Sequence, residues 1–85
     1  MSRFYFTYGD CLRFPFRGGW TVVEAETIDQ AESLFRAAHP DRNPGVLNCA
    51  GIYTEADFKR TKMFANGSNF GAGLHESIRL VVDRA

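Results

Sequence analysis

The stretch that decides the fold is Arg3-Phe-Tyr-Phe-Thr-Tyr8 (RFYFTY), close to the start of the chain. Successive side chains of a β-strand point to opposite faces of the sheet. Alternation therefore places three aromatic rings, those of Phe4, Phe6 and Tyr8, on one face. We interpret this face as part of the core of a small domain and residues 3–8 as its first strand.

The residues that follow predict a β-hairpin with a long loop. Gly9-Asp10 ends the first strand, and residues 9–19 form a loop that closes with Gly18-Gly19. Residues 20–26 are rich in β-branched side chains, which favour a second strand. The two strands should pair with each other.

A helix is predicted directly after the hairpin, over residues 28–38. Thr27 and Gln30 have the spacing of a capping box, in which each side chain satisfies a backbone amide of the first turn. The apolar side chains that then recur at helical spacing are Ile28, Ala31, Leu34, Phe35 and Ala38. Pro40 stops the helix.

The remaining residues predict two more strands and a second, shorter helix. Residues 46–53 read as a third strand, and Thr54 caps a helix that ends near Lys62. Residues 65–73 are rich in Gly and Asn and predict a mobile loop, and residues 77–83 alternate as a fourth strand. The expected fold is one α+β domain over residues 1–85, in the order β-β-α-β-α-β. Its four-stranded sheet is mainly antiparallel, with helix 28–38 packed on one face.

Composition limits the function classes. The chain has 85 residues, 45% of them hydrophobic and 24% charged, which is typical of a single globular domain. Its formal net charge is zero, and this weighs against general nucleic-acid binding. The sequence contains no signal-peptide pattern and no apolar run long enough for a membrane span. We therefore expect a cytoplasmic protein whose two cysteines are not joined in a disulfide.

Metal binding and catalysis find little support. Cys11, His39, Cys49 and His75 are of the right types for zinc, but they lack zinc-motif spacing and lie on different predicted elements. A zinc-stabilised domain remains a third reading, behind purely structural roles for these residues. Asp10 should raise the pKa of the neighbouring Cys11 thiol and so oppose nucleophilic catalysis. The glycine-rich loop lacks the Gly-Lys-Ser/Thr ending of a phosphate loop. The prediction is no cofactor, no metal and no enzymatic activity.

The first loop is the candidate binding segment. It presents arginines and aromatic rings together, a composition typical of interface hot spots and of stacking on a nucleotide base. Alternatively, Phe14 and Phe16 flank Pro15 and close the open end of the core. A second basic cluster lies near the predicted short helix. The predicted partner-binding residues are Arg13, Phe14, Arg17, Trp20, Lys59, Arg60 and Lys62. Another possible contact is an acidic face with Glu24, Asp29 and Glu32.

A resemblance adds a biological setting. The segments FYFTYG, FPF, GGWTVVEA, AESLFRAAHPDR and LNCAGIYTEADF resemble a group of small uncharacterised proteins from phages and mobile elements of gut and Gram-positive bacteria. The resemblance spans about residues 4–58. It implies a non-enzymatic inhibitor of a bacterial defence effector, such as an anti-CRISPR protein that blocks a functional surface of a CRISPR-Cas nuclease.

Other readings stay open beside it. A small module that sequesters a nucleotide-type signal would line its pocket with Tyr5, Arg13, Arg17, Trp20 and Tyr53, which would stack on the base and pair with phosphate. The leading expectation is a protein partner in the bacterial cytoplasm, without membrane contact and without direct nucleic-acid binding. A homodimer is compatible with it.

Overall fold

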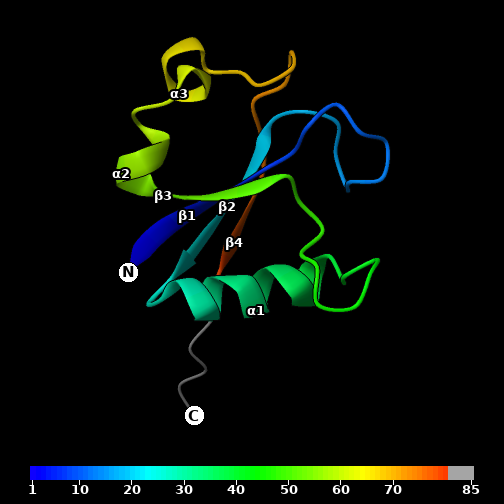
Figure 1. Ribbon diagram of the computed structural model, residues 1–85. Coiled ribbons are helices and arrows are strands. Elements are labelled where there is room, and N and C mark those ends of the chain that lie inside the picture. Colours follow the sequence, from blue (N-terminus) through cyan, green and yellow to red (C-terminus); the bar gives the residue numbers. More distant parts are fainter. Residues whose placement is uncertain (81–85) are drawn as a thin grey trace.

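The fold is a four-stranded sheet with helices on both faces (Figure 1). The computed structural model describes residues 1–80. The strand order is β3-β1-β2-β4, and β1 (Ser2–Thr7) pairs antiparallel with both β2 (Trp20–Ala25) and β3 (Gly51–Thr54). Strand β4 (Leu74–Arg79) lies parallel to β2 at the other edge. The predicted α+β class and the mainly antiparallel sheet are confirmed.

Helix α1 (Ile28–Ala38) has the predicted bounds because local interactions define both of its ends. Thr27 Oγ1 accepts a hydrogen bond from the Gln30 amide at 3.1 Å. Gln30 Oε1 accepts one from the Glu26 amide at 2.7 Å, so the capping box closes one residue before the cap. At the other end, the His39 amide donates to the Phe35 carbonyl, and Pro40 follows.

The sheet face that α1 covers holds the larger core, which we call the α1-side core. Phe6 and Phe35 are fully buried and stack with their ring centroids 4.4 Å apart. The predicted common face of Phe4, Phe6 and Tyr8 is confirmed. The buried members are Phe4, Phe6, Tyr8, Val23, Ala25, Ala31 and Phe35. Phe14 and Phe16 pack against this core from the first loop, so they close its open end.

The opposite face carries two short helices where the sequence predicts one. Helix α2 (Glu55–Phe58) begins at its predicted cap, since Thr54 Oγ1 accepts from the Asp57 amide at 3.2 Å. The chain then breaks, and Thr61 caps α3 (Lys62–Asn66). Phe58 of α2 is buried against the sheet. The α2-side core consists of Tyr5, Trp20, Val22 and Phe58.

Two strand boundaries differ from the predicted ones. Strand β3 begins at Gly51 and not at Val46, because the Val46 amide bonds to the Asn43 carbonyl and residues 43–46 form a turn. Strand β4 begins at Leu74, three residues before the predicted start. Residues 81–83 of the predicted fourth strand lie outside the described residues.

Candidate functional site

Backbone hydrogen bonds join the glycine-rich segment to the residues where the first loop meets β2. The Gly19 amide donates to the Asn69 carbonyl at 2.8 Å, and the Trp20 amide donates to the Gly73 carbonyl at 3.2 Å. Gly18 and Gly19 have φ angles of 67° and 68°, which L side chains rarely adopt. We call this contact between Gly18-Gly19 and residues 69–73 the glycine clasp. The segment that its composition predicts to be mobile is thus held at its middle, Asn69, and at its end, Gly73.

An aromatic side chain stands at the tip of this segment, in an unusual conformation. Asn69 and Ala72 exchange both backbone hydrogen bonds, so Phe70 and Gly71 are the two loop residues of a tight hairpin. Their φ angles are 52° and 82°, the signature of a type I′ turn. Phe70 is the sole non-glycine residue with positive φ among residues 1–80, and its side chain is 67% exposed. The turn therefore holds a large ring in solvent at a conformational cost.

One of the exposed basic residues near α3 lines the same hollow as Phe70. Lys62 and Phe70 both line a hollow of about 400 Å³ beside α3. Lys59, Arg60 and Lys62 are exposed, and none of them makes an ion pair within residues 1–80. Phe64 of α3 is 49% exposed. Phe64 lines a different hollow, with Trp20 and Phe58, so we call Lys59, Arg60, Lys62 and Phe70 the α3 surface.

A second concave site lies between the first loop and residues 42–48. This loop groove has a volume of about 500 Å³. Its walls include Arg13, Phe14, Arg42, Asn43, Val46 and Asn48. The Arg42 guanidinium donates to the Arg13 carbonyl at 2.9 Å and so joins the two walls.

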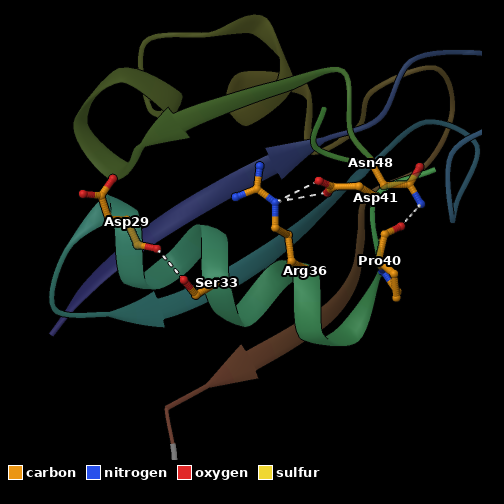
Figure 2. Close-up of polar contacts among 6 residues, drawn as sticks. All are labelled: Asp29, Ser33, Arg36, Pro40, Asp41 and Asn48. Carbon is orange, nitrogen blue, oxygen red and sulfur yellow. Dashed lines mark hydrogen bonds and ion pairs between the residues drawn. The ribbon is translucent and has the colours of Figure 1, made fainter. Parts of the chain in front are cut away.

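Two polar contacts hold the groove wall formed by residues 42–48, in the loop after α1 (Figure 2). Arg36 of α1 donates to both carboxylate oxygens of Asp41 at 3.1 Å. The Asn48 amide donates to the Pro40 carbonyl at 3.4 Å. The beginning and the end of this loop are therefore attached to the helix end.

The predicted partner-binding residues fall in different places. Arg13 and Phe14 line the loop groove, Arg17 is paired with Asp10, and the basic triad Lys59, Arg60 and Lys62 belongs to the α3 surface. Trp20 belongs to the α2-side core, where it is 8% exposed and packs edge-on against Phe58. Strand alternation could have predicted this burial, because Trp20 and Val22 lie on the same face of β2.

The two alternative residue sets do not assemble. Glu24 pairs with Arg3 at 3.2 Å and with Arg79 at 3.1 Å on the α2 face, whereas Asp29 and Glu32 belong to α1. No single acidic face results. The expected nucleotide pocket also divides, since Tyr5, Trp20 and Tyr53 gather around Phe58, away from the groove that Arg13 lines.

A partly buried series of hydrogen-bonded side chains links the end of α1 to the sheet, and no sequence pattern indicates it. The Tyr8 hydroxyl donates to Thr21 Oγ1 at 2.6 Å, and Thr21 donates to Glu76 Oε1 at 3.0 Å. His39 Nε2 pairs with the same carboxylate oxygen. Burial raises the pKa of Tyr8, so its hydroxyl remains a donor. Tyr8 and Thr21 are inaccessible to solvent. This series of hydrogen bonds therefore holds the end of α1, β2 and β4 together.

The four candidate zinc ligands make separate contacts and do not form one group. His39 pairs with Glu76, and His75 Nε2 lies 2.8 Å from the Gly18 carbonyl. Cys11 is exposed and Cys49 is half-buried. Within residues 1–80, no group of three His, Cys, Asp or Glu side chains is placed to hold a metal ion.

The two thiols should differ in reactivity. Burial raises the pKa of Cys49 to about 11, whereas Cys11 is exposed. Since the thiolate is the nucleophile, we expect iodoacetamide at pH 8 to label Cys11 at least about tenfold faster than Cys49. Mass spectrometry of timed samples measures both rates, and the Cys11→Ser variant should lack the fast phase. Equal rates at the two thiols would contradict the burial of Cys49.

Comparison with known family models, with curated proteins and with solved structures finds no match for the chain. Within residues 1–80, the structure contains no helix that is both long enough and apolar enough to cross a membrane.

Proposed function

We propose that the protein is a non-enzymatic binding protein that acts by covering a functional surface of a protein partner through the α3 surface. The observation that carries this proposal is the side chain of Phe70, which is 67% exposed on a turn whose backbone disfavours it. Strained conformations of this kind cluster at functional sites, where the strained residue performs a task that a relaxed one would not. An exposed aromatic ring is the usual anchor of a protein interface.

The surroundings of Phe70 suit an anchor. Two backbone hydrogen bonds close its turn, and Asn69 Nδ2 donates to the Tyr8 carbonyl at 2.9 Å, which fixes the turn to the sheet. A side chain on a backbone that is already fixed loses less conformational freedom on binding than one on a mobile loop. Lys62 lines the same hollow as Phe70. The three basic residues of the α3 surface favour an acidic partner surface, because charge complementarity guides association.

The resemblance to phage and mobile-element proteins supplies the class of partner. Under this proposal the partner is a bacterial defence effector in the cytoplasm, and a CRISPR-Cas nuclease is the first to test. Nucleic-acid-binding surfaces of nucleases are themselves basic, so a basic inhibitor surface would have to contact an acidic region elsewhere on the enzyme.

The variant Phe70→Asn separates function from folding. Asn is favoured at this position of a type I′ turn, so we expect the substitution to stabilise the fold by about 1 kcal/mol and to raise Tm by about 4–8 °C. Loss of the anchor should weaken inhibition at least about tenfold. The measurement is the plaque count of a phage that a CRISPR-Cas nuclease targets, on bacteria that express each variant.

Leu12→Asn is the matched control, because Leu12 is 81% exposed in the first loop, outside the α3 surface. It should protect the phage as well as the parent does. If Phe70→Asn also protects fully, the α3 surface is not the contact. If the parent chain gives no protection against any nuclease that is tested, inhibition of CRISPR-Cas nucleases is the wrong activity.

A further inference from the structure

We propose that the loop groove is a separate binding site for a small molecule that carries a phosphate group, such as a nucleoside monophosphate. This inference goes beyond the proposed function, because the groove and the α3 surface share no residue. It rests on the charge, the fixed geometry and the volume of the groove.

The groove has positive charge that the neighbouring carboxylates do not cancel. Two acidic residues flank its walls in the sequence, but Asp10 is paired with Arg17 and Asp41 is paired with Arg36. Within residues 1–80, neither Arg13 nor Arg42 makes an ion pair. The two guanidinium groups of the groove thus offer two positive charges to a ligand.

The Arg42 guanidinium is held in place before a ligand arrives. Arg42 uses one N–H group to contact the Arg13 carbonyl, and a guanidinium has five, so the others remain for a ligand. Asp41 is attached to Arg36 of α1, and Asn48 is attached to Pro40 just after the helix, as Figure 2 shows. A site whose donors are already placed loses less free energy on binding an anion.

The chemistry of the walls selects the class of ligand. Two guanidinium groups suit a phosphomonoester dianion, which accepts several charge-assisted hydrogen bonds at once. Phe14 and Val46 provide apolar contact area, and Asn43 offers both a donor and an acceptor for polar edges of the ligand. A volume of about 500 Å³ exceeds what phosphate alone needs and lies in the range of small-molecule sites. The expected ligand therefore has a phosphate group attached to a larger polar body.

The test is a titration of the ¹⁵N-labelled chain, followed by NMR, with adenosine monophosphate, adenosine and inorganic phosphate as probes. We expect the nucleotide to shift the amide signals of Arg13, Arg42 and Asn43 in a saturable manner. Adenosine should bind at least about tenfold more weakly, because it lacks the charge-assisted contacts. Inorganic phosphate should shift the same amides with lower affinity than the nucleotide.

Variants locate the site. Arg13→Gln keeps the backbone carbonyl that anchors Arg42, so it removes one charge from the groove while the wall stays joined. We expect it to weaken nucleotide binding about tenfold, and Arg42→Gln to weaken it at least as much. Arg60→Gln and Phe70→Asn change the α3 surface and should leave nucleotide binding unchanged, so a failure of the proposed function does not affect this result.

Three outcomes would overturn the proposal. The first is the absence of saturable shifts up to about 10 mM nucleotide, a concentration well above the Kd of a useful small-molecule site. The second is equal affinity for adenosine and its monophosphate. The third is a set of shifts confined to α3, which would place the anion on the basic triad and not in the groove.

Discussion

Replacing Gly19 with alanine is expected to destabilise the fold by about 3–4 kcal/mol, since it adds a steric clash to an unfavourable backbone conformation. A Cβ atom on Gly19 would lie 2.2 Å from the Gly73 carbonyl oxygen and 2.6 Å from His75 Nε2. Backbone atoms would have to move apart, and the hydrogen bond from the Gly19 amide to the Asn69 carbonyl would break. Thermal or urea unfolding measures the loss.

Gly45→Ala is the matched control for this prediction. Gly45 also has a positive φ, 79°, but a Cβ atom there meets no other atom within 4 Å. Its substitution should cost about 1 kcal/mol from backbone conformation alone. The difference between the two variants isolates the clash in the glycine clasp. If both lose the same stability, the clasp does not pack as tightly as described.

Phe58→Ala is expected to remove most of the packing of the α2-side core and to cost about 3–5 kcal/mol. Phe58 is 1% exposed and stacks on Tyr5 with 4.0 Å between ring centroids. The rings of Trp20 and Phe58 pack edge to face, with 4.9 Å between their centroids. Within residues 1–80 it is the one fully buried side chain of α2 and α3, so these two short helices depend on it.

Phe58→Leu provides the comparison, because leucine keeps an apolar side chain but not the aromatic stacking. It should cost about 1–2 kcal/mol, mostly from lost contact with Tyr5 and Trp20. Hydrogen exchange gives a second measurement: amides of α2 and α3 should lose protection in Phe58→Ala before those of α1 do. Uniform loss of protection in every element would show that the two cores do not behave separately.

Features that depend on neighbouring residues could be predicted from the sequence. Thr27 and Gln30 define the start of α1, and Pro40 defines its end. Each of them acts within about one turn of the end that it defines. The face shared by Phe4, Phe6 and Tyr8 follows from strand alternation alone. These elements are correct because their causes are local.

Features that depend on distant residues could not be predicted. Nothing near Leu74 indicates that β4 lies parallel to β2, because that pairing depends on segments far apart in the chain. The sequence predicts a continuous helix through Thr61, because the role of Thr61 as a cap requires the break after Phe58. Among the site residues, Arg42 was missed because the groove forms only when its loop meets the first loop. Phe70 could have been found, since Asn-Phe-Gly-Ala has the Gly spacing of a two-residue hairpin loop.

The parallel pairing of β4 with β2 also sets the order in which the molecule can assemble. Hydrogen-bonded residues of these strands, such as Thr21 and Glu76, are 55 positions apart, whereas the β1–β2 hairpin and α1 use contacts between near neighbours. Pairing between distant segments must first overcome the entropy of closing a long loop, so it forms late. In a nascent chain, the residues of the hairpin and of α1 are synthesised before those that complete the glycine clasp. A translation product that stopped before Asn69 would lack Phe70 and the clasp, and so could not present the α3 surface, even with its basic residues already synthesised.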